Sequence, residues 1–302
     1  MTSMIGGMIG GHEGDPQRTG EGGEFLRERA PVLISGLPGT MATLVAEALN
    51  RSQDFALVDV GLSSVRHSQE TIAVDGKHVD LIALPSGILL PPKEFFTGLG
   101  EGLIVVDYAN SVSVNGNAEL YAQVGLPFVM GTTGGDREQL VETVRKSEIC
   151  AVIAPNMAFE VVRVQQVVET LAQNAPGLFN GWEFDIVDSH QNGKGRSGTA
   201  DAFSNLFIAL GAVSRNRVEI RDPEKQRALG IPDEYLKGHA YHWMTLQSPD
   251  GVSTIEFRTQ VNGRQPYVDG TLMALRFLRE QVAAGAKGQV FSMVDVLASQ
   301  AR

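Results

Sequence analysis

The stretch from Pro31 to Arg51 constrains the fold more than any other part of the chain. A short apolar run, 32–35, leads into a turn with glycines at positions 36 and 39, and helical periodicity follows from Met41. Gly36 permits a tight turn, and Gly39 lets the backbone at a helix N-terminus come close to an anion. The pattern predicts a buried strand, a phosphate-binding turn and a helix. An ordinary glycine turn is the alternative interpretation.

The same alternation continues to about residue 154. Further apolar runs of strand length lie at 55–60, 79–84, 103–108, 127–130 and 150–154. Segments of helical length separate several of them, and strands that alternate with helices indicate a parallel sheet with right-handed crossovers. We therefore predict an α/β fold whose first part is a Rossmann-like, doubly wound parallel sheet.

The rhythm changes after residue 157. Predicted helices and strands follow at 158–174, 182–189, 199–210, 218–221, 238–248, 252–261 and 270–283. Helices beside a run of neighbouring strands are typical of an α+β unit. We predict a flexible tail at 1–29, a dinucleotide-binding domain formed by 30–156 and 265–302, and an inserted α+β domain at 157–264 for substrate binding and oligomerisation.

Charge and cysteine content exclude several classes of protein. The chain has 25 basic and 35 acidic residues, a net charge of −10, so neither a nucleic-acid partner nor an anionic membrane surface is expected. Nor does any apolar run approach the ~20 residues that span a bilayer. The single cysteine, Cys150, excludes an intrachain disulfide, and its apolar neighbours predict an inert buried thiol. A reducing compartment fits this content.

Two strand ends in the first part carry small residues with exposed backbone groups, which suit contact with a nicotinamide. Plain loops are the alternative for both. The second predicted strand does not end in the carboxylate that binds the ribose of NAD, which favours NADPH, although NADH stays open. Our predicted cofactor contacts are Gly36, Leu37, Pro38, Gly39, Thr40, Met41, Ser63, Gly131, Thr132, Thr133, Ala154, Pro155, Asn156 and Met157.

The stretch from Asp188 to Ala200 carries the candidate chemistry. His190 and Lys194 are two proton-carrying groups on a glycine-rich loop. The helix that follows begins with a serine, a glycine and a threonine, which offer hydroxyl and N–H donors to a carboxylate. A solvated loop with an ordinary helix cap is the alternative. No metal is expected, because His239 and His242 face opposite sides of a strand.

This stretch resembles the active-site loop of the dihydrodipicolinate reductases, whose pattern reads Glu-x-His-His-x-x-Lys-x-Asp-x-x-Ser-Gly-Thr-Ala. The resemblance implies that His190 is an acid/base group and that Lys194 donates a proton. It implies further that a substrate carboxylate is held near Gln191, Ser197, Gly198 and Thr199. Gln191 replaces the second histidine, as in the plant-type branch, and the loop before Ser197 is shorter than the family's.

The resemblance also implies an activity: reduction of dihydrodipicolinate (4-hydroxy-tetrahydrodipicolinate) to tetrahydrodipicolinate with NADPH or NADH. This step belongs to the diaminopimelate route of lysine biosynthesis. A homo-oligomer, dimer or tetramer, is expected in the cytoplasm, or in the plastid stroma of a photosynthetic eukaryote. The alternatives are a non-catalytic nucleotide-sensing Rossmann protein and another Rossmann dehydrogenase of amino-acid biosynthesis. A sensor has no need for the lysine beside a helix cap, and aspartate or homoserine enzymes lack the loop.

Overall fold

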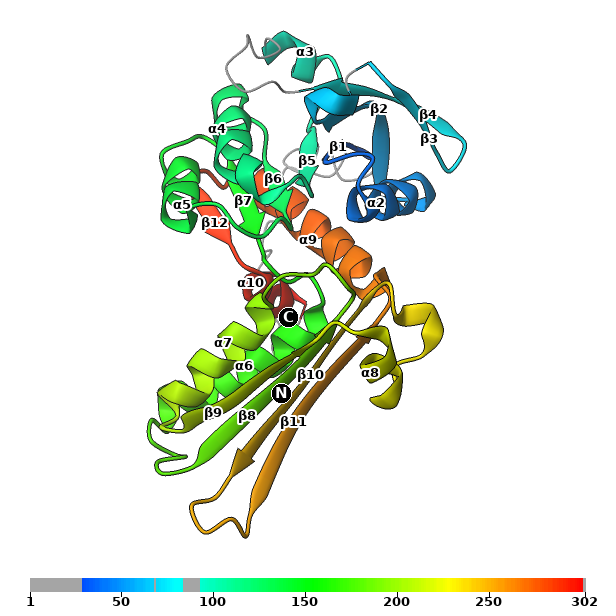
Figure 1. The fold of residues 1–302 in the computed structure, drawn as a ribbon. Helices are drawn as coiled ribbons and strands as arrows, with labels where there is room; N and C mark the ends of the chain where they lie inside the picture. The colour runs from blue at the N-terminus through cyan, green and yellow to red at the C-terminus, as the bar shows by residue number, and fades with distance from the viewer. Residues whose placement is uncertain (1–28, 68, 84–92, 301–302) are drawn as a thin grey trace, which may run out of the picture.

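The chain folds into two sheets with helices packed against them (Figure 1). The structure, a computed structural model, describes residues 29–67, 69–83 and 93–300. Apart from Arg29, the tail predicted at 1–29 lies outside the described residues. The predicted α/β architecture, a parallel-dominated sheet with a second α+β unit, is confirmed.

The first sheet has eight strands in the order β12-β7-β6-β5-β1-β2-β4-β3. All neighbours are parallel except β3 and β4, which form an antiparallel hairpin. The strand order reverses between β1 and β5, so the carboxyl ends of these strands flank a crevice where ligands gather in such sheets. The strands are β1 (Ala30–Ser35), β2 (Phe55–Ser63), β3 (Thr71–Val74), β4 (Lys77–Ala83), β5 (Ile104–Asp107), β6 (Phe128–Met130), β7 (Cys150–Ile153) and β12 (Gln289–Phe291).

Helices cover both faces of this sheet and bury its apolar strands. One face carries α2 (Thr40–Arg51), α9 (Gln265–Ala283) and α10 (Met293–Ser299). The other carries α3 (Lys93–Thr97), α4 (Val114–Val124) and α5 (Arg137–Arg145). The short 3-10 helices are η1 (Val65–His67), η2 (Ser111–Ser113) and η3 (Asp233–Tyr235).

The second sheet has four strands in the order β11-β10-β8-β9. They are β8 (Glu183–His190), β9 (Val213–Ile220), β10 (His239–Gln247) and β11 (Thr254–Asn262). Two helices, α6 (Phe159–Asn174) and α7 (Gly198–Ala209), pack on one face, where Phe184, Phe203 and Phe207 are fully buried. The short α8 (Pro223–Ala228) lies near the carboxyl end of β9 (Figure 1).

Three predicted boundaries are wrong. The strand predicted at 218–221 begins at Val213, because β9 is an edge strand whose polar side chains show no apolar alternation. The helix predicted from Gly270 begins at Gln265, because the proline in its first turn is compatible with a helix start. The second strand continues to Ser63, because Gly61 leaves room for the packed side chains of Leu37 and Leu81.

Cys150 behaves as its apolar neighbours predict. It lies on β7 with no exposed surface, and burial raises the pKa of its thiol to about 11. The thiolate is therefore scarce at neutral pH, and the thiol is a packing residue.

The chain crosses between the sheets twice, and the two crossings touch. It leaves the first sheet through Met157 and returns along α9, where a Cβ on Gly270 would stand 1.8 Å from the Met157 carbonyl oxygen. Only glycine permits this approach, so position 270 fixes how closely α9 packs against the outgoing chain.

We therefore expect Gly270→Ala to lower the free energy of unfolding by about 1–3 kcal/mol, because the added methyl overlaps backbone that has little room to move. The measurement is denaturant unfolding followed by circular dichroism. Gly116→Ala in α4 is the matched control, since a Cβ there meets nothing within 4 Å and should stabilise the helix by about 0.5–1 kcal/mol. Equal behaviour of the two variants would contradict the close packing.

Candidate functional site

The turn between β1 and α2 is shaped for an anion. Gly36 has a φ of +106°, and a Cβ there would lie 2.5 Å from the backbone of Tyr108. A Cβ on Gly39 would lie 2.8 Å from the Gly36 carbonyl oxygen. The helix N-terminus has no side-chain cap and no acidic residue in its first turn. Such a glycine cradle at an uncapped helix fits the pyrophosphate of a dinucleotide.

The end of β2 lies beside this turn. Ser63 donates its hydroxyl to the carbonyl of Leu37, so one predicted cofactor residue supports another. Asp59 lies within β2 rather than at its end, with its side chain 80% exposed and paired to Lys77 at 2.7 Å. Neither contact puts a carboxylate at the strand end.

A buried carboxylate that we did not predict organises the crevice. Asp107 ends β5 with no exposed surface. It accepts hydrogen bonds from the Thr132 hydroxyl at 2.9 Å, the Tyr121 hydroxyl at 2.7 Å, the Asn117 amide at 2.8 Å and the Ala109 N–H at 3.0 Å. Asp107 therefore holds the loops after β5 and β6 together. An acidic residue at the end of an otherwise apolar strand was the available signal.

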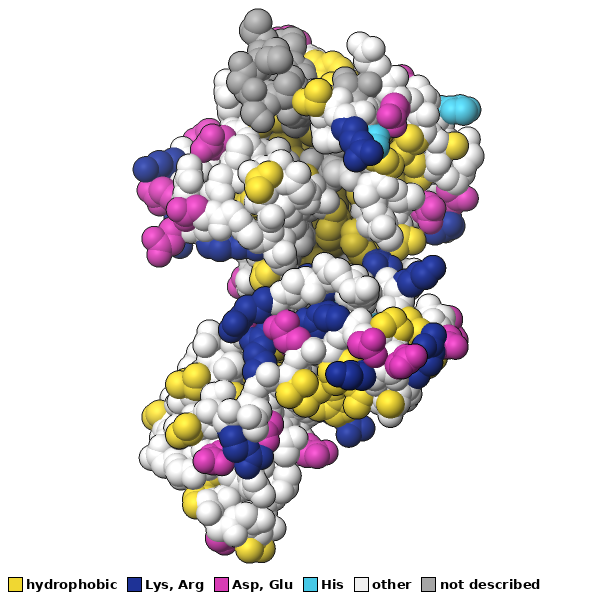
Figure 2. All heavy atoms as spheres, in the orientation of Figure 1, with side chains coloured by type: hydrophobic (Ala, Val, Ile, Leu, Met, Phe, Trp, Pro, Cys, Tyr) yellow, Lys and Arg dark blue, Asp and Glu magenta, His cyan; other side chains and the backbone are white. Residues whose placement is uncertain are grey.

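A cavity of about 840 Å³ opens where these loops meet the second sheet. Figure 2 shows Lys and Arg side chains gathered at this junction. Of the predicted site residues, those that line the cavity are Met41, Gly131, Thr132, Thr133, Pro155, Asn156, Met157, His190, Gln191, Lys194, Ser197, Gly198 and Thr199. Those outside its lining are Gly36, Leu37, Pro38, Gly39, Thr40, Ser63 and Ala154. The cavity thus joins two of the predicted cofactor loops to all of the predicted catalytic and substrate-binding residues.

His190 ends β8 and is held from behind by a carboxylate. Its Nδ1 lies 3.1 Å from Oδ2 of the fully buried Asp188, and its carbonyl accepts a bond from Gln226 at 2.7 Å. Burial opposes the charge on Asp188, but hydrogen bonds from His190 and Arg221 outweigh it and lower the pKa of the carboxyl. An ionised carboxylate can only accept a hydrogen bond, so Nδ1 of His190 donates to Asp188 and Nε2 is the nitrogen left for the cavity.

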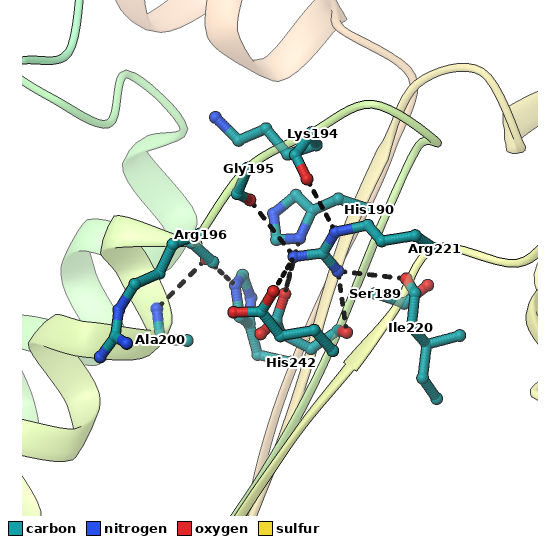
Figure 3. Close-up of polar contacts among 12 residues, drawn as sticks. Ser189, His190, Lys194, Gly195, Arg196, Ala200, Ile220, Arg221 and His242 are labelled. Atoms are coloured by element: carbon teal, nitrogen blue, oxygen red, sulfur yellow. Dashed lines mark hydrogen bonds and ion pairs between the residues drawn. The ribbon is translucent and has the colours of Figure 1, made fainter.

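Lys194 lies in the turn that follows, where its N–H bonds the Gln191 carbonyl at 3.1 Å. Its side chain is exposed and lines the cavity (Figure 3). Within the described part of the chain, no residue forms a hydrogen bond or ion pair with its amine. The ammonium is therefore available to a ligand.

The N-terminus of α7 forms one wall. Ser197 caps it by accepting the Ala200 N–H at 3.3 Å, as predicted. The amides of the first turn have no helical partner, and they favour an anion. Asp201 in this turn would oppose an anion, but it pairs with Arg196 at 2.7 Å and with Arg217. The two arginines offset its charge.

His242 and His239 line the cavity as neutral, structural groups, which the sequence favoured over metal binding. His242 bonds Ser197 Oγ at 3.1 Å and Thr259 Oγ1 at 3.0 Å, and burial lowers its pKa to about 3. His239 bonds Ser189 Oγ at 2.9 Å, and burial lowers its pKa as well. Residues 29–67, 69–83 and 93–300 contain no group of three or more potential metal ligands.

Two contacts at the cavity escaped the sequence analysis. Asn156 on the cofactor side donates to Thr199 Oγ1 at 3.3 Å, which links the two halves of the site. Arg264 also lines the cavity and brings a further positive charge to it. Its guanidinium donates to the Lys237 carbonyl at 3.0 Å.

Comparison with known proteins decides the family. The family models described as dihydrodipicolinate reductase, N-terminus and C-terminus, match residues 30–157 and 160–297. The chain is 38% identical to the chloroplastic 4-hydroxy-tetrahydrodipicolinate reductase 2 of Arabidopsis thaliana, over 88% of this chain and 76% of that protein. A probable rice counterpart (Oryza sativa subsp. japonica) is 40% identical over 88% and 82%.

The chain belongs to the dihydrodipicolinate reductase family. A member from the bacterium Herminiimonas arsenicoxydans is 23% identical over 88% of this chain, so the likeness is greater to the plant proteins, as the loop with Gln191 predicts. The dipicolinate-bound dihydrodipicolinate reductase from Paenisporosarcina sp. TG-14 shares the fold, with a TM-score of 0.59 at 15% identity over 88% of this chain and 98% of that one. In the described part of this reductase no helix is long and apolar enough to cross a membrane.

The buried His242 makes the stability of this reductase depend on pH. The pKa of His242 is about 3 in the folded protein, below the ordinary value of 6.5. As the pH falls below 6.5, His242 is therefore protonated in the unfolded chain but stays neutral in the folded protein. Stability is therefore lost between these two values. Lowering the pH from about 7.5 to about 5.5 should cost the parent roughly 1 kcal/mol more than it costs His242→Gln. Denaturant unfolding at both pH values measures the difference, and an equal cost would mean that folding leaves the pKa of His242 at its ordinary value.

Proposed function

We propose that this protein reduces 4-hydroxy-tetrahydrodipicolinate to tetrahydrodipicolinate with NADH or NADPH, in the diaminopimelate route to lysine. The relatives carry this activity in their names. The observation that carries the proposal is the single cavity that joins the cofactor loops, a helix N-terminus suited to a carboxylate, and two proton-carrying side chains, His190 and Lys194. Each part meets one need of a hydride transfer to a small cyclic dicarboxylate.

The cofactor would be held by the glycine turn before α2, with Ser63 beside it, and by the loops at 131–133 and 154–157. When bound, it supplies the hydride. The strand end at Ser63 has no carboxylate to repel a 2′-phosphate, which supports NADPH as a cofactor at least as good as NADH. The network around Asp107 keeps the nicotinamide-side loops in place.

The chain's own groups would bind and protonate the substrate. The first-turn amides of α7, with the Thr199 hydroxyl and Gln191, would hold one carboxylate. Nζ of Lys194, supported by Nε2 of His190, would deliver the proton that completes the reduction. Both lie at the cavity wall beside that helix N-terminus, so binding and proton delivery act on the same ring.

We propose further that 30–156 with 265–302 and 157–264 are two domains that close on the cavity, as lids of such enzymes do. A homo-oligomer, dimer or tetramer, would form through the open face of the four-stranded sheet. That face carries exposed strands β9 and β11. The location would be the cytoplasm, or the plastid stroma in a photosynthetic eukaryote, and the chloroplastic names of the plant relatives support the second case.

The direct test follows NADPH and NADH absorbance while dihydrodipicolinate synthase supplies the substrate. Turnover that needs the synthase product supports the function. Cofactor binding without turnover would instead identify a nucleotide sensor.

Lys194→Met should lower kcat by at least about 100-fold, since removal of a positioned proton donor typically costs 10²–10⁴ in rate. Cofactor affinity should stay within a few-fold, because the cofactor turn lies on the other sheet. His190→Gln should lower kcat and also raise KM. Lys225→Met is the matched control, since Lys225 is exposed on α8 outside the cavity. A Lys194→Met protein with the kcat of this control would make Lys194 a surface residue.

Thr199→Val should weaken inhibition by pyridine-2,6-dicarboxylate about tenfold or more, the size of one hydrogen bond to a charged group. The substitution keeps the shape of the side chain and the backbone amides. It removes the acceptor of the Asn156 amide, but it leaves the glycine turn before α2 intact, so the NADPH affinity measured by fluorescence titration should change by no more than a few-fold. Thr170→Val on α6, outside the cavity, is the control. Unaltered inhibition in Thr199→Val would place the dicarboxylate elsewhere.

A further inference from the structure

One guanidinium reaches both parts of the proposed proton-carrying loop. Arg221 follows β9, and its side chain lies between the end of β8 and the loop at 191–197 (Figure 3). Its Nε donates to the carbonyl of Lys194 at 3.0 Å, and its Nη2 lies 3.3 Å from the carbonyl of Gly195. The side chain is only 17% exposed. The backbone that carries Lys194 is therefore tied to a fixed, half-buried group.

The same guanidinium reaches the partner of the histidine. Nη1 of Arg221 donates to the Asp188 carbonyl at 3.2 Å, and Nη2 donates to Asp188 Oδ2 at 2.8 Å. That oxygen also lies 3.1 Å from His190 Nδ1. The other carboxylate oxygen, Oδ1, has no hydrogen bond within the described residues and lies 3.7 Å from Arg217 Nη2.

Stability alone is a weak reason for such an arrangement. Burying a carboxylate and a guanidinium costs solvation that their attraction often fails to repay, so an apolar pair serves stability equally well. A guanidinium with forked donors is instead suited to fixing several acceptors at once. Here its acceptors are the backbone of Lys194 and Gly195 and the carboxylate behind His190.

We propose that Arg221 and Asp188 are positioning residues of the reduction. Together they fix the backbone of Lys194 and the ring nitrogen of His190 that carries the proton. Arg221 sets the course of the Lys194 loop and orients Asp188. Asp188 keeps the proton of the neutral imidazole on Nδ1, so that Nε2 faces the cavity. This inference rests on the roles proposed above for His190 and Lys194.

The first test compares turnover. Arg221→Lys keeps the charge but loses the forked donors, and we expect kcat to fall by about 100-fold, the cost of a displacement near 1 Å. Arg215→Ala is the matched control, because Arg215 lies on β9, the strand that leads to Arg221, and pairs with Asp185 and Glu183 away from the cavity. NADPH affinity should be unchanged in both. An Arg221→Lys enzyme with a kcat within about threefold of the control would overturn the proposal.

The second test reads the histidine itself and needs no turnover. Nitrogen-15 spectra of the imidazole rings, taken at the alkaline plateau of a titration, report which nitrogen carries the proton. His190→Gln identifies the His190 signals by their loss. We expect the Nδ1–H form in the parent and a mixture of both forms in the nearly isosteric Asp188→Asn. An Nδ1–H form that persists in Asp188→Asn would overturn the role of Asp188.

The third test asks whether the two residues act together. If they form one unit, the kcat of Asp188→Asn/Arg221→Lys should equal that of the slower single variant within about threefold. Independent roles would multiply the two losses and overturn the claim of one unit. If the parent itself fails to reduce the synthase product, the proposed function is wrong, whereas the parent imidazole spectrum still reports whether Asp188 fixes His190.

Discussion

The arrangement of this molecule depends on the contact between the two chain crossings. Where α9 passes the outgoing chain, the Met157 carbonyl occupies the space that a side chain at Gly270 would need. The crossings therefore act as one joint, and the joint adjoins Asn156, which reaches Thr199 at the start of α7. Both contacts connect the loops proposed to bind the cofactor with the loop proposed to bind the substrate.

The three histidines at the cavity, His190, His239 and His242, have different surroundings and therefore different roles. His242 and His239 are buried without a carboxylate partner, and burial lowers the pKa of both, so they serve as neutral hydrogen-bonding groups for Ser197 and Ser189. Of the three, only His190 forms a hydrogen bond with a buried carboxylate, that of Asp188. One residue type thus supplies two kinds of support and one candidate for proton transfer, and the neighbours decide which.

Sequence patterns predicted the parallel sheet, the glycine turn before α2, the helix start at Ser197 and the loop that carries His190 and Lys194, because these features depend on local periodicity and turn chemistry. The start of β9 was missed because an edge strand buries too little to impose alternation on Ser214 to Arg217. Asp107, Asp188 and Arg221 were missed for a different reason. Most of their partners lie on other strands or loops, so apart from the position of Asp107 at the end of an apolar strand, the local pattern does not show these contacts.

The inertness of Cys150 has a practical and a biological side. A chain whose sole thiol is buried, with a pKa of about 11, offers nothing for disulfide exchange with redox carriers. Because Cys150 is buried, maleimide dyes should not label the native protein. Two cysteines introduced on the surface, one on each sheet, could therefore be labelled selectively to follow the relative motion of the sheets while Cys150 stays in place.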